Sequence, residues 1–415
     1  MTINLHAPTR RELLLASGTL FAWAYTPKLA LAEGRDPRLL AIVLRGALDG
    51  LAAVAPVGDP NWVKLRGDSA LILGGQTPAL PLDGMFALNP AMPNLHRLFK
   101  AGAATIVHAA ATPYRERSHF DGQDVLESGL PRPGAVSTGW LNRALATLAP
   151  ADRANPRARN AFAVGPIAPL VVRGAAPVLS WTPPRLPPTG DDTVMRLLDL
   201  YRHTDPALAR VLEERMGLAA IARAGGMNQQ GAANAQPRGA ANAVRAYFEQ
   251  SAGAAAKFLA RADGPRIGAL AFDGWDTHAN EGADAGRLAA LLAALDGALG
   301  AIETEMKDAW RETVVAVITE FGRTARINGT EGTDHGTGTV ALLVGGAVKG
   351  GRVISDWPGL KPANLYQGRD LAPTNDLRAV FKGVLQDHLG IGDRALAEAV
   401  FPDSAPVKAM KGLLG

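Results

Sequence analysis

Short apolar runs separated by longer amphipathic segments dominate the chain beyond about residue 37. Residues 39–44 (LLAIVL) and 313–318 (TVVAVI) are almost wholly apolar and too short for typical helices. Such runs are typical of strands that are buried on both faces. Segments such as 286–307 have the length of helices that cover a sheet. The alternation of the two predicts an α/β fold, with a mostly parallel central sheet and helices on both faces.

The predicted elements follow one another along most of the chain. The predicted strands span residues 39–44, 104–108, 162–164, 170–172, 267–272, 313–318 and 340–344. The predicted helices span residues 93–101, 118–128, 140–148, 191–224, 242–261, 286–307 and 377–389. Residues 225–241 (GGMNQQGAANAQPRGAA) are rich in small and polar side chains. Because the strand and helix pattern resumes after them, they are predicted to form a flexible loop inside a single domain over 33–415.

The N-terminus has the pattern of an export signal. Arg10 and Arg11 precede an apolar stretch free of charge, and Ala30-Leu31-Ala32 follows as a small-x-small cleavage site. This order predicts a twin-arginine signal peptide over residues 1–32. Its apolar stretch is shorter than the roughly 20 residues that cross a bilayer. The sequence therefore predicts a periplasmic or extracytoplasmic protein that uses the twin-arginine export machinery and keeps no stable membrane span after cleavage.

Composition excludes several classes of chemistry. The chain has 415 residues, a net charge of +4 and no cysteine. Without cysteine there are no disulfides, thiolate metal sites or thiol nucleophiles. No basic tract with interleaved aromatic residues is present, so no nucleic-acid partner is expected. Hydrophobic residues make up 47% of the chain, enough for a large core.

Polar side chains gather where the predicted strands end. In open α/β sheets, ligands bind beyond the carboxyl ends of the strands. Carboxylates and imidazoles brought to one edge are the ligands that divalent metals such as Zn²⁺ and Mn²⁺ accept, and Mg²⁺ or Ca²⁺ remain open, with one or two ions. The candidate metal ligands are Asp49, Asp273, Asp276, His278, Glu320 and His335, with Arg45 and Arg323 as charge-balancing neighbours.

Each candidate ligand also has a structural interpretation. Asp49 precedes a helical segment and could be an N-cap. Asp273 and Asp276 could cap a turn, and His278 could be a hydrogen-bonded surface histidine. Glu320 follows a buried strand, so its carboxylate needs a metal ion or an arginine partner such as Arg323.

A serine nucleophile is predicted at the start of a helix. Ser118 lies in YRERSHFD, where the backbone N–H groups of a helix N-terminus attract anions and stabilise a developing alkoxide. Arg117 could hold an oxyanion of a phosphate or sulfate ester. His119 could contact substrate or orient a ligand. The alternative is that Ser118 is only an N-cap, with Asp121 as its capping partner.

Several motifs together resemble those of the DUF1501 family. They are RGALDGLAAVAP, RSHFDGQDVLESG, STGWLNRAL, FDGWDTHANEG, ITEFGRTARINGTEGTDHGTGT and LLVGGAVKGG. The resemblance extends from about residue 37 to residue 415. Members of this family are typically exported by the twin-arginine route, and the family has no assigned function.

The order of these motifs resembles that of the alkaline phosphatase and sulfatase superfamily. In this sequence the order runs Asp49, Ser118, Asp273 or Asp276 with His278, Glu320 and His335. Two departures stand out. Glu320-Phe321 occupies the position of an expected Asp-His pair, and no Ser-x-Pro-x-Arg or Cys-x-Pro-x-Arg surrounds Ser118, which argues against formylglycine chemistry.

The resemblance implies an alkaline-phosphatase-like fold and a metal-dependent hydrolase of phosphate or sulfate esters that uses Ser118. Its substrate would be a small molecule or an ester of the cell envelope. Two alternatives remain: a non-catalytic periplasmic binding or assembly protein with an incomplete metal site, and an envelope enzyme that transfers a group instead of hydrolysing it.

Overall fold

The computed structural model describes residues 35–134, 136–148, 161–165, 167–181 and 240–415, with shorter pieces at 198, 201–202, 205–213 and 216. The predicted signal peptide at 1–32 and most of the predicted helix at 191–224 lie outside the described residues. Of the predicted loop at 225–241, only Ala240 and Ala241 are described, and they begin a helix. No helix in these ranges is long and apolar enough to cross a membrane.

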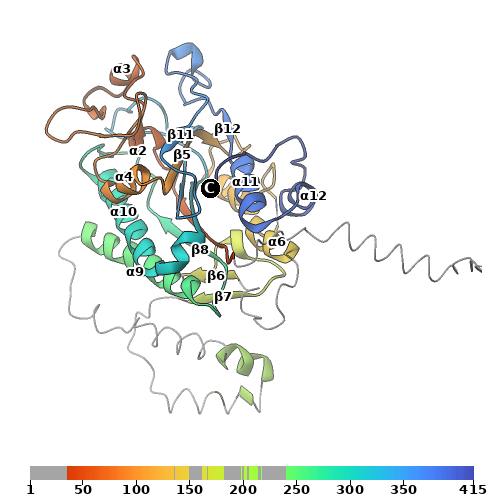
Figure 1. The fold of residues 1–415 in the computed structure, drawn as a ribbon. Helices are drawn as coiled ribbons and strands as arrows, with labels where there is room; N and C mark the ends of the chain where they lie inside the picture. Colours follow the sequence, from red (N-terminus) through yellow and green to blue (C-terminus); the bar gives the residue numbers. More distant parts are fainter. Residues whose placement is uncertain are drawn as a thin grey trace, which may run out of the picture.

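A nine-stranded sheet forms the centre of the molecule (Figure 1). Its order is β11-β5-β10-β9-β1-β8-β6-β7, with β12 beside β5. Every pairing that involves β10 is antiparallel and the others are parallel, so the predicted mostly parallel sheet is confirmed. The strands are β1 (Arg38–Arg45), β5 (Ala104–Ala111), β6 (Ala161–Val164), β7 (Val178–Trp181), β8 (Ile267–Asp273), β9 (Thr313–Thr319), β10 (Thr339–Val344), β11 (Arg352–Ile354) and β12 (Asn375–Asp376).

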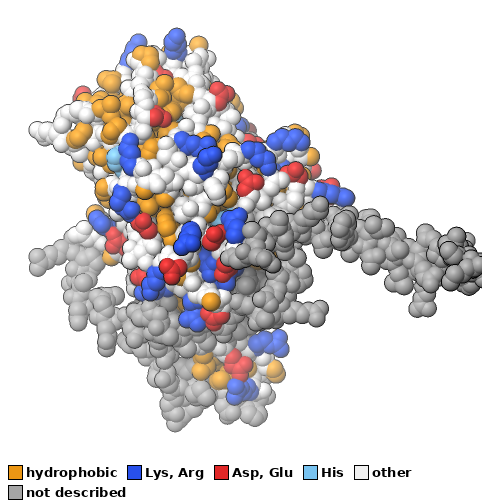
Figure 2. Space-filling model, viewed as in Figure 1, with side chains coloured by type: hydrophobic (Ala, Val, Ile, Leu, Met, Phe, Trp, Pro, Cys, Tyr) orange, Lys and Arg blue, Asp and Glu red, His pale blue; other side chains and the backbone are white. Residues whose placement is uncertain are grey.

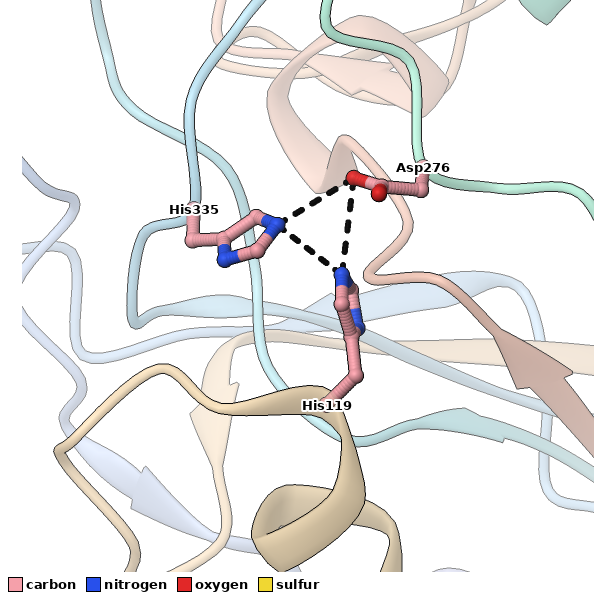
Figure 3. Close-up of side chains that lie close together, drawn as sticks. All are labelled: His119, Asp276 and His335. Carbon is pink, nitrogen blue, oxygen red and sulfur yellow. Dashed lines mark hydrogen bonds and ion pairs between the residues drawn. The ribbon is translucent and has the colours of Figure 1, made fainter.

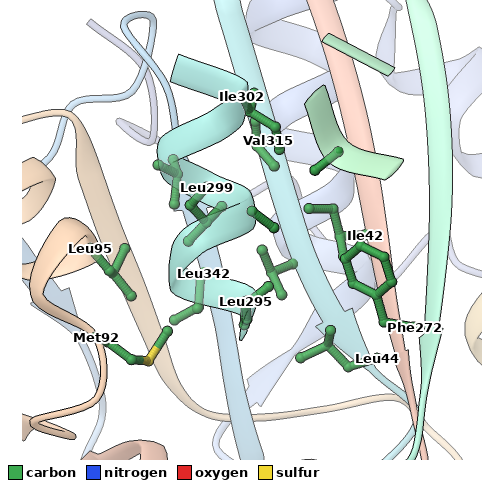
Figure 4. Close-up of a cluster of buried hydrophobic side chains, with 14 of the residues drawn as sticks. Ile42, Leu44, Met92, Leu95, Phe272, Leu295, Leu299, Ile302, Val315 and Leu342 are labelled. Atoms are coloured by element: carbon green, nitrogen blue, oxygen red, sulfur yellow. The ribbon is translucent and has the colours of Figure 1, made fainter. Parts of the chain in front are cut away.

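Helices cover both faces of this sheet because each central strand is apolar on both sides. On β1, Leu40, Ile42 and Leu44 enter one hydrophobic cluster, while Leu39, Ala41 and Val43 enter another on the opposite face. The first cluster packs against α4 (Pro93–Lys100), α9 (Ala240–Ala260) and α10 (Arg287–Met306). Figure 4 shows Leu295, Leu299 and Ile302 of α10 and Leu95 of α4 in this cluster. The second packs against α5 (His119–Ser128), α6 (Trp140–Thr147) and α11 (Leu377–Leu389).

Shorter elements surround this framework. A three-stranded sheet consists of β2 (Val54–Ala55), β4 (Ala87–Leu88) and β3 (Leu80–Pro81). The short helical turns are α2 (Gly50–Ala53), α3 (Trp62–Arg66), η1 (Gly67–Ser69), η3 (Leu170–Val172), η5 (Lys307–Glu312), η6 (Pro362–Asn364), α12 (Asp393–Ala395) and η7 (Leu396–Val400).

On the face seen in Figure 2, basic and acidic side chains are intermingled, without a broad area of one sign.

One predicted strand is wrong. Residues 170–172 form the 3-10 turn η3. Their backbone groups pair with side chains instead of a neighbouring strand, since Val171 N–H donates to Glu127 and Asn142 donates to Val172 C=O. The edge strands β7, β11 and β12 were not predicted, because they are short and only partly buried.

The topology brings several loops to one edge of the sheet. Strands β1, β5, β8 and β9 are parallel, so their carboxyl ends share an edge. Strand β10 runs the opposite way, so the segment that precedes it reaches that same edge. The fold therefore places the polar segments after β1, β8 and β9 together with the segment before β10.

Leu295 provides a test of this packing. The side chain lies fully buried on α10 within the first cluster. We expect Leu295→Ala to lower the free energy of unfolding by about 2–5 kcal/mol, through lost burial and the cavity left behind. Thr304→Ala on the exposed side of α10 is the control, expected to change it by less than about 1 kcal/mol. Urea unfolding measures both, and equal effects would contradict the packing.

Candidate metal centre

Four donor atoms from three segments converge at this edge. His119 is the first residue of α5, Asp276 and His278 follow β8, and His335 precedes β10. The Nε2 atom of His335 lies 2.9 Å from that of His119 and 3.0 Å from that of His278. Asp276 Oδ1 lies 3.0, 3.2 and 3.4 Å from the Nε2 atoms of His278, His335 and His119. His119, Asp276 and His335 form a group that could hold a metal ion (Figure 3).

Hydrogen bonds behind the rings determine which nitrogens face this point. His119 Nδ1 lies 2.8 Å from Glu320 Oε1, and His335 Nδ1 lies 2.9 Å from the carbonyl oxygen of Arg117. An ionised carboxylate and a carbonyl only accept, so each ring donates from Nδ1. In a neutral ring, Nε2 then carries a lone pair, and these two lone pairs face each other at 2.9 Å. That contact is repulsive unless a proton or a cation lies between them.

The spacing of the three atoms in this group suits a metal ion. Ligands at about 2.0–2.1 Å from a tetrahedral ion lie roughly 3.3 Å from one another. The separations among His119, His335 and Asp276 run from 2.9 to 3.4 Å, and the ring of His278 lies beside them, 3.0 Å from both His335 and Asp276. The side chains of Asp276 and His278 are 41% and 45% exposed, so the group is open to solvent on one side. These residues could therefore hold one ion, with room for a further ligand.

Glu320 orients a ring of this group and is not one of its four donors. Its buried carboxylate accepts from Gly46 N–H at 2.9 Å and from Gln123 at 3.2 Å, in addition to His119. Burial acts to raise the pKa of Glu320, but the hydrogen bond from His119 and these further bonds lower it overall. The same bond raises the pKa of His119. The sequence left a metal ion or Arg323 open as the partner of Glu320; in the structure His119, Gly46 and Gln123 donate to its carboxylate instead.

Arg323 holds Asp276. Its fully buried guanidinium donates to Asp276 Oδ1 at 2.6 Å and also to Thr333. Burial opposes ionisation of Asp276, but Arg323 outweighs it and lowers the pKa of this carboxyl. Burial and the nearby His119 lower the pKa of His335, which favours the neutral ring that binds metals.

Asp49 lies elsewhere, in a buried ion pair. Its Oδ1 accepts from the N–H groups of Leu51 and Ala52, which makes it the N-cap of α2. Both of its oxygens also accept from Arg66, which is itself buried. The structure therefore gives Asp49 the capping role that the sequence left open, and its carboxylate is already satisfied without an ion.

The other predicted residues surround the four donors without joining them. Asp273 is an exposed residue at the end of β8. Arg45 is paired with Glu127, and Arg117 with Asp370. Ser118 is the N-cap of α5, directly before His119, but its side chain makes no capping bond. The first turn of α5 therefore keeps N–H groups that no side-chain cap satisfies.

Sequence reasoning missed two buried charged residues near the centre. Arg66 lies in no motif, and its partner Asp49 is 17 positions away. Glu281 lies in a polar stretch, NEGAD, that predicts a surface loop, yet it is only 2% exposed. Burial, followed by the charge of Asp49, raises the pKa of Glu281 to about 7, while Arg66 acts to lower it. No pattern in the sequence identified either residue.

The fold and the site define an α/β protein with a candidate histidine–carboxylate metal centre at the carboxyl edge of its sheet. Residues 100–400 match the family described as "Protein of unknown function (DUF1501)". The match covers most of the chain, so the protein belongs to the DUF1501 family, as its motifs predict. A comparison with curated proteins found no match.

Two solved structures are among those similar to this chain. One is described as Ps i-CgsB in complex with k-i-k-neocarrahexaose; it is 13% identical, with a TM-score of 0.37, over 77% of this chain and 68% of that chain. The other is phosphonate monoester hydrolase of Agrobacterium radiobacter; it is 12% identical, with a TM-score of 0.35, over 86% of this chain and 75% of that chain.

The Asp49–Arg66 pair can be tested by removing one charge. Asp49→Asn leaves the guanidinium of Arg66 buried without its ion-pair partner. We expect a loss of about 3–5 kcal/mol in the free energy of unfolding. Asp68→Asn, at a nearby exposed position, should change it by less than about 1 kcal/mol. Urea unfolding compares the two variants, and an Asp49→Asn value close to wild type would refute the structural role.

Glu281 should make stability depend on pH. Its pKa is raised from 4.5 to about 7 in the folded protein, so the folded state keeps a proton that the unfolded chain releases between those values. Its contribution to stability is therefore complete below pH 4.5 and declines as the pH rises towards 7, by at most about 1.4 kcal/mol per pH unit.

We expect Glu281→Gln, which cannot ionise, to gain stability relative to wild type between pH 5 and pH 7. Urea unfolding of both proteins in the presence of a chelator measures the difference at each pH. A difference that stays constant across this range would show that the carboxyl ionises normally in the fold.

Proposed function

We propose that this protein is an exported, metal-dependent hydrolase of phosphate or sulfate esters. The observation that carries the proposal is the convergence of three imidazole nitrogens and one carboxylate oxygen, from His119, His278, His335 and Asp276, on a side open to solvent. Donor atoms that bear lone pairs repel one another at this spacing unless a cation lies between them, and the open side leaves a position for substrate.

The donor set favours a borderline metal. Imidazole suits Zn²⁺ and other first-row ions, whereas Mg²⁺ and Ca²⁺ prefer oxygen ligands. A donor set dominated by imidazole nitrogens therefore favours Zn²⁺ over Mn²⁺, Mg²⁺ or Ca²⁺. A single ion is proposed, because Arg66 already neutralises the carboxylate of Asp49. A bound ion would supply positive charge that stabilises a developing oxyanion and lowers the pKa of a nearby hydroxyl.

Ser118 is the proposed nucleophile. It directly precedes His119, at the N-terminus of α5, where uncapped N–H groups and the helix dipole favour an anionic group. Its Oγ would form a bond to phosphorus or sulfur as the bond to the departing alcohol breaks, and the serine proton would end on that alcohol. Water would then cleave the seryl ester, which returns the serine hydroxyl and releases phosphate or sulfate.

The arginines act on this centre through its ligands. Arg323 fixes Asp276, and the carbonyl group of Arg117 fixes His335. The guanidinium of Arg117 is held by Asp370, and that of Arg45 by Glu127, so each positive charge is already paired. Their proposed contribution is to orient the ligands, with a smaller effect on charge at the transferred group.

The location and partners proposed for the protein follow from its N-terminus. Arg10-Arg11, the apolar stretch and Ala30-Leu31-Ala32 support export by the twin-arginine machinery into the periplasm or beyond. That route carries folded proteins, so an ion could be bound before export. The substrate proposed is an ester of a small molecule or of the cell envelope.

The alternative function is that of a non-catalytic binding or assembly protein. One observation favours it: two of the predicted ligands are satisfied by other residues, Asp49 by Arg66 and Glu320 by His119, so the predicted metal set is incomplete. Such a protein would leave every ester intact, with or without a bound ion.

Ser118→Ala separates the two functions. The mature protein should contain about one metal ion per chain and cleave an aryl phosphate or an aryl sulfate. We expect Ser118→Ala to retain the metal and to lower kcat at least 100-fold, since the nucleophile is removed. Ser251→Ala, in α9 on a helix-covered face of the sheet, is the control and should match wild type.

Metal content by elemental analysis and ester cleavage by product release are the two measurements. A protein that binds its ion but cleaves neither ester, with or without Ser118, would support the binding protein. A protein that binds no metal and cleaves neither ester would overturn the hydrolase and leave the binding or assembly function.

A further inference from the structure

Two loops carry three of the four donors, and their backbones are joined. Loop A (residues 274–283) carries Asp276 and His278, and loop B (residues 327–338) carries His335. Three backbone hydrogen bonds connect the loops at 2.9–3.2 Å. They run from Asn280 N–H to Thr330 C=O, from Glu281 N–H to Glu331 C=O, and from Thr333 N–H to Thr277 C=O. The separation of His278 from His335 therefore depends on how these loops are held.

The side chain of Glu281 bridges the same two loops. Its Oε1 accepts from the hydroxyl of Thr277 at 2.7 Å, and its Oε2 accepts from the hydroxyl of Thr333 at 2.9 Å. Thr277 directly precedes His278, and Thr333 lies two residues before His335. All three bridging residues are buried. One carboxylate thus fixes the two points at which these loops approach the centre.

The bridge continues to the third donor. Thr333 Oγ1 also accepts from Arg323 Nε at 3.1 Å, and the same guanidinium donates to Asp276 Oδ1 at 2.6 Å. A buried path of hydrogen bonds therefore runs from Glu281 through Thr333 and Arg323 to Asp276. Because the loops come from strands far apart in the chain, only contacts of this kind set their relative position.

The backbone around the bridge is tightly constrained. Asn280 and Glu331, on facing loops, adopt left-handed conformations with φ of 45° and 58°. Such conformations cost energy for residues other than glycine and persist only where neighbouring contacts impose them. A Cβ atom on Gly332 would lie 2.3 Å from the carbonyl of His278, so this close approach of the two loops requires glycine at that position.

The carboxylate of Glu281 is costly to bury. Among the described residues, no lysine, arginine or histidine lies within ion-pair distance of it. A buried carboxyl group without a direct cation destabilises a fold unless hydrogen bonds compensate it. Its two hydroxyl partners, Thr277 and Thr333, lie one and two residues before His278 and His335.

We propose that Glu281 is a positioning residue of the metal centre, which sets the distance between His278 and His335 by bridging Thr277 and Thr333. This inference rests on the metal centre of the proposed function. It does not depend on which ester is cleaved, or on whether any is.

Metal affinity tests the proposal without reference to ester cleavage. The full mature chain, freed of metal, is titrated with Zn²⁺ in competition with a chromogenic chelator. We expect Glu281→Gln to raise the Kd for Zn²⁺ about 10–100-fold, the range found for residues that orient metal ligands. Absorption of the Co²⁺-loaded protein reports ligand geometry, and we expect the bands of Glu281→Gln to shift from those of wild type.

Asp296→Asn is the matched control. Asp296 is a buried carboxylate that accepts from the N–H groups of Asn94 and Leu95 at the start of α4. We expect this variant to lose stability while its Kd and Co²⁺ spectrum remain those of wild type. Thermal unfolding of the metal-free proteins confirms that each variant folds. A Glu281→Gln variant with the wild-type Kd and spectrum would overturn the proposal.

Thr333→Val keeps the proposal testable if Glu281→Gln fails to fold. It removes one hydroxyl of the bridge and nearly conserves volume, and we expect it to weaken Zn²⁺ binding at least 5-fold. In a folded double variant, the loss of Zn²⁺ binding free energy should be smaller than the sum of the losses in the two single variants, because both changes break the same bridge. Losses of binding free energy that add fully, or a wild-type Kd for Thr333→Val, would contradict the proposed role of Glu281.

The outcomes separate this proposal from the proposed function. A wild-type protein that binds no Zn²⁺ removes the metal centre and this inference together. A wild-type protein that binds Zn²⁺ but cleaves no ester removes only the hydrolase. Normal Zn²⁺ binding by both the Glu281 and Thr333 variants removes only the positioning role.

Discussion

Electrostatic repulsion between like donor atoms is the constraint on which this site depends. Each of the three imidazole nitrogens and the carboxylate oxygen lies 2.9–3.4 Å from at least two of the others, where lone pairs repel unless a cation or proton intervenes. A flexible surface would let such side chains separate. Here Glu320, Arg323 and the carbonyl of Arg117 each fix one of them from behind. The sheet and the hydrogen bonds between the loops hold these supporting groups in place.

The same constraint explains which parts of the site could be predicted from sequence. His278, His335 and Asp276 lie just beyond or before strands whose apolar runs are unmistakable, so the common edge of the sheet brings them together. His119 was predicted only as a substrate contact or as a residue that orients a ligand, because its position depends on the start of α5 next to Glu320. Glu320 was predicted as a ligand, since a sequence cannot tell a residue that binds an ion from one that orients its neighbour.

The buried charged residues are the part of the structure that could be predicted least well from the sequence. Asp49 follows the first strand, where the motif order implies a ligand, but Arg66 satisfies it. Nothing near Arg66 distinguishes it from a surface arginine, and its role depends on how α3 folds back towards Asp49. Glu281 lies in a segment that is as polar as any loop. Predicting either residue requires the three-dimensional path of the chain, whereas the sheet can be predicted from apolar runs of the right length alone.

The reversed direction of β10 has a consequence for how the protein is made. Strand β10 lies between β5 and β9, and β5 precedes it by more than 200 residues. His335 reaches the edge of the sheet only after β10 has inserted there, so a nascent chain that ends before β10 has at most three of the four donors in place. Loop closure over such separations is slow. Assembly of the centre is therefore a late folding event, and an intact site reports that the chain has folded at least as far as β10.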